Sequence, residues 1–340
     1  MRFDFTSEQV AFRDAVRELL ARECPPARVR AAWADGTPLA VWPHLARAGV
    51  VGMTAPERWG GLGLDELDLV LVLEEAGRAG LPEPLLETTA VAIPLVSETA
   101  PTAFADRWLG AAAAGRAVMS VGLAGAPFVA DAARADLLVL EHDGDVHAIE
   151  RAHAALTAQP SVDGARKLAR VDWRPGAHTL LATGEPARAA LARAFDRGAL
   201  AAAAQLCGLG RRMLAVTVEY VQVRTQFGRP VGSFQAVKHH LADALVGLEL
   251  AAPCVYRAAH AIARGEPDRA VHVSLAKARA SEAALAAGRA ALQCHGAIGY
   301  SFEHDLHLFM KRAWALAAAW GDAAWHRARI ATAILGDHHA

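Results

Sequence analysis

The stretch RTQFGRPVGSFQAVKHHLADA, residues 224–244, lies where one long helical pattern ends and the next begins. Gly228 and a proline two residues later end the first helix and turn the chain. The turn carries Arg224, Gln226 and Phe227, which offer a guanidinium, an amide and an aromatic ring. Such a set fits a ligand with a diphosphate and a flat ring, whereas an arginine at this position also caps free helix carbonyls. Both interpretations stay open on these residues alone.

A second stretch, LQCHGAIGYSFEHDLH at 292–307, is also typical of a helix that ends in a glycine turn. Gln293 offers an amide, and Gly296 either lets the backbone approach a ligand or closes a tight turn between helices. His304 and His307 follow at a spacing of three and share one helix face. Two histidines without a third ligand in register do not make a zinc site. We therefore expect no metal here, and a polar helix face or subunit contact instead.

Long helical patterns surround both stretches and occupy residues 186–340. Glycine and proline separate four helical segments, at 187–224, 233–264, 267–294 and 302–335. Long helices with short connections predict an antiparallel four-helix bundle.

The rest of the chain divides into a helical part and a β-rich part. Residues 1–116 are helical, and Thr6 and Gln9 have the spacing of a capping box. Residues 117–185 form short β-branched runs, two of which flank an Asp-Gly hairpin turn at 143–144. The predicted fold is mainly α with a small β-domain, arranged as an N-terminal α-helical domain, a reduced middle β-domain and a C-terminal four-helix bundle.

Two further glycine clusters do not match a nucleotide-binding loop. WGGLGL at 59–64 lies between helices and lacks the lysine and hydroxyl residue of a P-loop, so it predicts a tight turn. CGLGRR at 207–212 lies inside a helical pattern, where glycine allows close packing of two helices.

Composition excludes several function classes. The formal net charge of −1 argues against a non-specific nucleic-acid surface. No apolar run approaches the roughly 20 residues that a membrane span needs. The four cysteines are far apart in sequence and form no CxxC pair, which is typical of a reduced compartment. We expect a cytoplasmic protein that binds neither nucleic acid nor membrane.

On these motifs the chain resembles the acyl-CoA dehydrogenase family. The stretch at 224–244 is similar to the family's Arg-x-x-Phe-Gly segment with its following Phe-Gln and Leu-Ala-Asp. QCHGAIGY at 293–300 is similar to Gln-x-x-Gly-Gly-x-Gly-Tyr, and the N-terminal helices with PERWGGLGL also fit. The resemblance covers nearly the whole chain, and it implies the predicted three-part fold with FAD held between the subunits of a dimer.

The resemblance also implies which residues contact the cofactor. Seven residues match positions that reach the FAD of the neighbouring subunit: Arg224, Gln226, Phe227, Gln235, Gln293, Gly296 and Ala297. Ala297 stands where the family usually has a glycine.

The catalytic base of the family has no counterpart at the matching positions. Family members use a glutamate to remove the proton α to a thioester carbonyl, while the flavin accepts hydride from the β-carbon. The usual glutamate position is Trp320 here, and the position used by other branches is Gly198. Neither side chain accepts a proton, so we assign no catalytic residue. Asp322 and Asp196 remain candidates for a relocated base.

The β-domain also departs from the family, because its Thr-Glu-Pro loop has no counterpart between Val118 and Thr183. A chain that keeps contacts to a neighbour's flavin but lacks its own base resembles the short subunit of heteromeric α2β2 acyl-CoA dehydrogenases. This implies a longer homologue as partner, a bulky acyl-CoA substrate such as one with a shortened steroid side chain, and an acceptor such as an electron-transfer flavoprotein. Two alternatives remain: a self-sufficient homomeric enzyme with a relocated acid, and a flavin-free structural or regulatory homologue.

Overall fold

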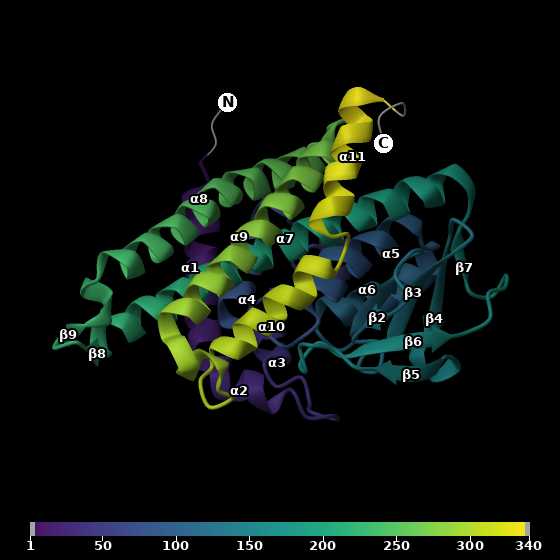
Figure 1. The fold of residues 1–340 in the computed structure, drawn as a ribbon. Helices are drawn as coiled ribbons and strands as arrows, with labels where there is room; N and C mark the ends of the chain where they lie inside the picture. The colour runs from purple at the N-terminus through teal and green to yellow at the C-terminus, as the bar shows by residue number, and fades with distance from the viewer. Residues whose placement is uncertain (1–3, 337–340) are drawn as a thin grey trace.

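The computed structural model describes residues 4–336 and has the predicted order of helices, strands and helices (Figure 1). The N-terminal helices are α1 (Ser7–Glu23), α2 (Pro26–Ala31), α3 (Trp42–Arg47), η1 (Glu57–Trp59), α4 (Glu66–Ala79), the π-helix η2 (Leu86–Ala92), α5 (Ile93–Thr99) and α6 (Thr102–Ala113). The predicted capping box of α1 is confirmed, because Gln9 N donates to the Thr6 hydroxyl at 3.2 Å and Thr6 N donates to Gln9 Oε1 at 2.9 Å.

The middle of the chain forms two small sheets, seen on the right of Figure 1. The strands are β1 (Met119–Gly122), β2 (Val129–Ala130), β3 (Leu137–His142), β4 (Asp145–Glu150), β5 (Ala155–Gln159), β6 (Leu168–Asp172) and β7 (Leu180–Ala182). Their orders are β1-β3-β4-β7 and β2-β6-β5. The predicted hairpin is confirmed: β3 and β4 are antiparallel, and Asp143 and Gly144 turn the chain with φ of 52° and 82°.

The C-terminal part is the predicted bundle. Its helices are α7 (Gly184–Val223), α8 (Gln235–Ala263), α9 (Arg269–His295), α10 (Leu306–Ala318) and α11 (Ala323–Leu335), with a small hairpin, β8 (Thr225–Gln226) and β9 (Arg229–Pro230), at the far end of α7 (Figure 1). The short helices η3 (Arg151–His153), η4 (Val231–Ser233) and η5 (Gly296–Tyr300) lie in the connections. The fold is therefore mainly α with a small β-domain, as predicted. None of the helices described between residues 4 and 336 is long and apolar enough to cross a membrane.

The predicted single helix at 302–335 is wrong. The chain breaks it after Ala318, because Trp320 and Gly321 take left-handed φ values of 58° and 83°. Asp322 then caps the new helix α11, accepting a hydrogen bond from Trp325 N at 2.8 Å. The prediction missed the break because the apolar pattern continues on both sides of it, although Gly321 and Asp322 are local signals for the end of one helix and the start of the next.

Glycines allow the bundle to lie directly on the N-terminal helices. A Cβ on Gly208 of α7 would overlap the carbonyl of Glu74 in α4, and one on Gly77 of α4 would overlap the carbonyl of Gln205 in α7. The prediction that the CGLGRR cluster serves helix packing is confirmed. The two backbones touch without an intervening side chain, which fixes α7 against the N-terminal domain.

We predict that Gly208→Ala destabilises the protein by about 2 kcal/mol or more, since the added methyl has no room between two backbones. Gly247→Ala is the matched control in α8. Its Cβ would lie 3.8 Å from the Cβ of Ala283, an ordinary contact, and alanine favours the helix. Urea unfolding followed by circular dichroism measures both changes, and equal effects of the two substitutions would contradict the packing argument.

Candidate functional site

The seven residues predicted to contact a cofactor lie at one end of the bundle. Arg224, Gln226 and Phe227 belong to the hairpin after α7, and Gln235 begins α8. The end of α9 meets the last turns of α7, where the rings of Tyr220 and His295 stack at 4.5 Å. The remaining members follow along that helix end: Gln293, Gly296 and Ala297. All seven are exposed.

The hairpin holds its aromatic ring out from the bundle. Phe227 is 91% exposed and has a φ of 53°, and Gly228 follows with a φ of 76°. Left-handed φ at both central residues defines a tight hairpin turn, in which a bulky first residue is strained. The ring packs edge-on against Phe234, with ring centroids 6.1 Å apart, and the guanidinium of Arg229 lies 4.2 Å from the centroid of that second ring.

The polar groups at this end of the bundle are also exposed and can contact a ligand. Arg224 is exposed, and within residues 4–336 it forms no ion pair with a carboxylate. Its carbonyl accepts from Val231 N at 2.8 Å, so the backbone of the hairpin is fixed while the guanidinium is free. Gly296 has a φ of 64°, and a Cβ built on it would meet nothing within 4 Å. A free guanidinium, an exposed ring and an open stretch of backbone fit a nucleotide diphosphate.

The two histidines of the second stretch are not brought together as metal ligands. His304 packs edge-on against His295, with ring centroids 4.6 Å apart. His307 Nε2 lies 3.3 Å from Arg30, and its ring packs against Trp33 at 5.3 Å. The one group of three ligand atoms found among the described residues is elsewhere, at Glu266, Asp268 and His272.

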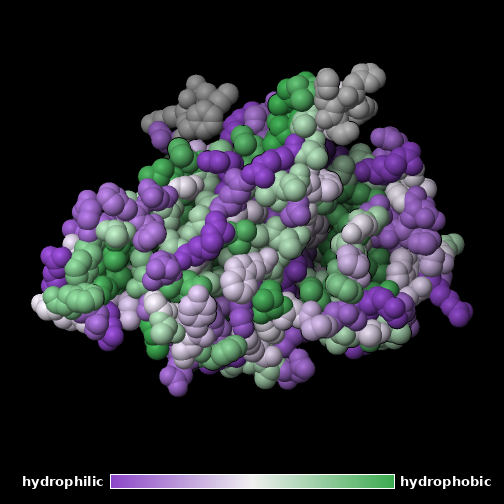
Figure 2. Space-filling model, in the orientation of Figure 1, coloured by the Kyte–Doolittle hydropathy of each residue, from purple (hydrophilic) through white to green (hydrophobic). Residues whose placement is uncertain are grey.

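A separate cleft of 740 Å³ lies between the β-domain and the bundle. The surface in Figure 2 is hollowed at this place, and hydrophobic residues line the hollow. Five aromatic side chains face it: Phe128, Phe195, Trp314, Trp320 and Trp325. The loop on its β side consists of small residues at 124–127, which leaves the cleft open there. Its walls suit a bulky apolar molecule.

The two positions that the family resemblance assigns to a catalytic base meet at the wall of this cleft, where Trp320 lines the cleft and Gly198 lies against its indole. A Cβ on Gly198 of α7 would overlap the indole ring of Trp320. The ring of Phe195 flanks the same indole, 6.2 Å away. The tryptophan thus occupies the space beside Gly198, and no proton acceptor stands at either position.

The two candidate relocated acids are both engaged. Asp196 is fully buried, and its carboxylate pairs with Arg269 at 3.1 Å and Arg329 at 2.8 Å. It does not line the cleft. Asp322 does line the cleft, while one of its oxygens caps α11. Of the two, only Asp322 is placed where it could reach a ligand in the cleft.

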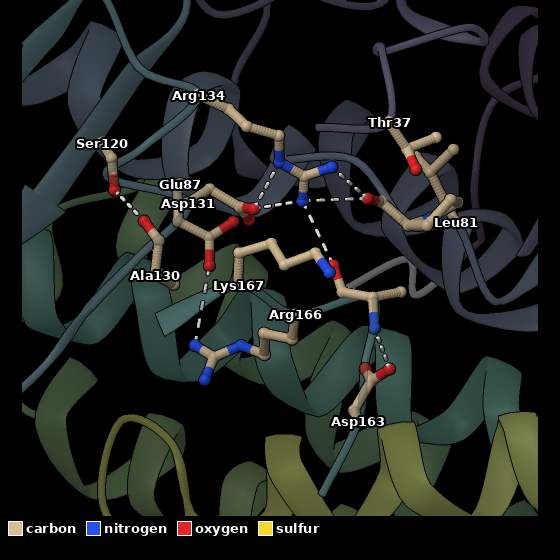
Figure 3. A network of polar contacts seen from close by, with 12 residues as sticks. Thr37, Leu81, Glu87, Ser120, Ala130, Asp131, Arg134, Asp163, Arg166 and Lys167 are labelled. Carbon is tan, nitrogen blue, oxygen red and sulfur yellow. Dashed lines mark hydrogen bonds and ion pairs between the residues drawn. The ribbon is translucent and has the colours of Figure 1, made fainter. Parts of the chain in front are cut away.

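A buried network of charges lies beside the cleft, which two of its members, Glu87 and Arg166, also line, and sequence reasoning missed it (Figure 3). Arg312 of α10 pairs with Asp163 and donates to the carbonyl of Leu81 at 2.6 Å. Six side chains take part: Glu87, Asp131, Arg134, Asp163, Arg166 and Arg312. Burial raises the pKa of Glu87, and nearby Arg166 opposes that shift. The network joins all three parts of the fold, and no sequence spacing marks it because its members come from distant elements.

Glu83 lies beside this network and makes stability pH-dependent. Its Oε1 accepts from Val41 N at 2.7 Å, and burial raises its pKa to about 7. An acid whose folded pKa lies above its ordinary value of 4.5 stabilises the fold below that value and loses this contribution as the pH rises through 7.

We therefore predict that Glu83→Gln, compared with wild type, gains stability progressively between pH 5 and pH 8, by on the order of 2 kcal/mol. The glutamine keeps an acceptor for Val41 N and removes the buried charge. Urea unfolding at several pH values measures the difference. A difference that is constant with pH would contradict the assignment.

We also predict that Gly198→Ala destabilises the fold by about 1–3 kcal/mol in the wild type and by much less in a Trp320→Ala background. The indole blocks the added methyl only when it is present. A double-mutant cycle of unfolding free energies measures the coupling, and additive effects would show that the ring does not sit on Gly198.

The order of N-terminal helices, a small β-domain and a C-terminal helical bundle defines the class of protein, because it is the acyl-CoA dehydrogenase fold. The sequence profile for the acyl-CoA dehydrogenase N-terminal domain matches residues 6–116, and that for the C-terminal domain matches residues 188–335. The chain belongs to the acyl-CoA dehydrogenase family.

Individual relatives agree with this membership. The chain is 36% identical to the acyl-CoA dehydrogenase IpdE2 of Mycobacterium tuberculosis, over 90% of this chain and 91% of that protein. It is 33% identical to the acyl-CoA dehydrogenase FadE34 of the same organism, where 80% of this chain matches only 39% of the relative. The structure of the ChsE4–ChsE5 complex from Mycobacterium tuberculosis matches the fold with a TM-score of 0.89, over 100% of both chains at 24% identity.

FAD is the cofactor of this family, and the residues at the bundle end fit its nucleotide half. The free guanidinium of Arg224, the exposed ring of Phe227 and the open backbone at Gly296 support this fit. The cleft between the β-domain and the bundle differs from the bundle end, because its space beside Gly198 is filled by Trp320.

Proposed function

We propose that this chain is the short subunit of a heteromeric α2β2 FAD-dependent acyl-CoA dehydrogenase. It supplies cross-interface FAD contacts to a longer catalytic homologue, which desaturates an acyl-CoA thioester between the α- and β-carbons. One contrast carries the proposal: the cofactor-binding end of the bundle is exposed, whereas Trp320 packs on Gly198 where a base would stand.

The roles of this chain's residues follow from their chemistry. When bound, FAD supplies the hydride acceptor for the desaturation. The guanidinium of Arg224 would hold the pyrophosphate through paired hydrogen bonds, and Gln226 and Gln235 would fix the polar edges of the adenosine half. Phe227 would cover the adenine ring, and the glycine turn would bring backbone groups to the same nucleotide. The partner supplies the base that removes the α-proton.

A partner subunit is also supported by exposed apolar side chains on the bundle. Four of them lie on α7 and α8 and are 39% to 58% exposed: Val218, Leu245, Val246 and Leu250. Val246 and Leu250 lie one turn apart on α8, and grouped exposed apolar side chains of this kind mark protein interfaces. The ChsE4–ChsE5 structure is a two-protein complex with this fold, and FadE34 joins a region similar to this chain to a longer polypeptide.

The cleft supports a bulky acyl group as substrate. Its volume of 740 Å³ is larger than a short acyl chain needs, and its aromatic walls suit an apolar group. A shortened steroid side chain that is still attached to its rings is one example of a bulky acyl group. On this proposal the reduced flavin passes electrons to an electron-transfer flavoprotein, and the complex is cytoplasmic.

The test is to produce the chain alone and together with a longer acyl-CoA dehydrogenase homologue from the same genome. We expect a stable complex with one FAD per pair of subunits, and a lone chain without bound flavin. A lone chain that is yellow, carries one FAD per protomer and desaturates acyl-CoA would end the proposal.

Within the complex, we predict that Arg224→Ala lowers the flavin content at least tenfold at micromolar FAD, because a charge-assisted pair of hydrogen bonds is lost. Absorbance at the flavin band relative to protein measures the content. Arg264→Ala is the control, since Arg264 is an equally exposed arginine at the opposite end of α8. Unchanged flavin in both variants would favour a flavin-free structural or regulatory role for this fold.

The self-sufficient enzyme remains a second candidate because Asp322 lines the cleft. Asp322→Asn tests it cleanly, since asparagine caps a helix as well as aspartate does and removes only the proton acceptor. The proposed short-subunit role predicts unchanged turnover of the complex. A loss of turnover with an unchanged melting temperature would identify Asp322 as the base.

A further inference from the structure

Lys277 of α9 is a fully buried lysine that none of the roles above uses. Its ammonium donates to Ser281 Oγ at 3.2 Å, to Ala317 O at 3.0 Å and to Gly321 O at 2.9 Å. No carboxylate is hydrogen-bonded to it within the described residues. Lysines are almost never buried in this way unless paired, because desolvation of the charge is costly. The hydrogen bonds of Lys277 must therefore stabilise a part of the structure that offsets this desolvation cost.

The acceptors of Lys277 lie around the break between α10 and α11. Ala317 belongs to the last turn of α10, whose carbonyls have no helical partner, and Gly321 lies in the break itself. The three acceptors satisfy all three ammonium protons and leave none directed at a ligand. Lys277 is also absent from the lining of the cleft, so it has no access to substrate.

A second buried side chain holds the same break from α11. His326 is fully buried, and its Nε2 lies 2.8 Å from the carbonyl of Trp320. A carbonyl only accepts, so Nε2 carries the proton and Nδ1 accepts from the hydroxyl of Ser274 at 3.0 Å. Burial lowers the pKa of His326 to about 4, which keeps the ring neutral in this tautomer.

Lys277 and His326 thereby bind the carbonyls of Gly321 and Trp320, the two left-handed residues of the break. A left-handed tryptophan is strained and persists only where its surroundings impose it. The flanking pattern at 302–335 is that of one continuous helix, so the break needs such support.

We propose that Lys277 and His326 are positioning residues that lock the turn at 319–322 and hold the indole of Trp320 on Gly198 as a fixed wall of the cleft. Lys277 and His326 thus determine the shape of the cleft without lining it, so neither side chain contacts a ligand bound there. Loss of the His326 donor frees the carbonyl of Trp320, and loss of the Lys277 donor frees those of Ala317 and Gly321. Either loss relaxes the turn and releases the indole from Gly198. This inference stands on the geometry of one chain and holds whether or not the chain pairs with a longer subunit.

The experiment uses the full chain labelled with 5-fluorotryptophan, and fluorine NMR reports each indole separately. Trp320→Phe identifies the resonance of Trp320 among the eight tryptophans. In Lys277→Met and in His326→Leu we expect this resonance to move and to acquire the solvent isotope shift of an exposed ring in deuterated water. The resonances of Trp42 and Trp108, in the N-terminal helices, should stay in place.

Two controls separate positioning from general destabilisation. Lys238→Met removes an exposed lysine and should move no resonance of Trp320. His326→Gln keeps an amide donor for the carbonyl of Trp320 and should restore most of the wild-type position. If Lys277→Met does not fold, His326→Leu carries the test. A Trp320 resonance that is unchanged in folded His326→Leu would overturn the proposal.

Discussion

Direct contact between the backbones of α4 and α7 is the constraint on which the rest of the molecule depends. Gly77 and Gly208 remove the side chains that would separate the two helices. Helix α7 is 40 residues long, and this contact fixes it along the N-terminal domain. Because the other bundle helices pack on α7, the position of one helix determines both the cleft at Gly198 and the hairpin at its far end.

The middle of α7 and its C-terminal end have opposite chemical character. Near its middle, Gly198 receives the indole of Trp320, and the cleft presents apolar and aromatic walls. At its end, the hairpin presents Arg224 and Phe227 to solvent. The groups proposed to bind a nucleotide are thus exposed to solvent, and the indole of Trp320 fills the space beside Gly198. This separation supports the proposal that this chain supplies cofactor contacts while a second subunit supplies the base.

Local signals explain how much of this could be predicted from the sequence. The Thr6 capping box and the hairpin turn at 143–144 depend on neighbouring residues, so their patterns predicted them correctly. The residues of the bundle end were found through family motifs, and their exposure agrees with a role toward a neighbour. The charge network around Arg312 depends on contacts between distant elements, and so does the support that Lys277 gives to the break at Trp320. No local pattern encodes these contacts.

The hairpin turn has a consequence for assembly. Phe227 is already locked in a strained, two-residue turn before any partner arrives, so association freezes little additional chain entropy. On the proposed function, the ring is held ready for the nucleotide of the neighbouring subunit, which makes binding geometrically selective. The same preset ring is a liability in a chain without its partner, because exposed apolar rings promote self-association. On the proposed function, a cell that makes this subunit in excess over its partner accumulates unpaired subunits that self-associate. This favours production of the two chains in equal amounts.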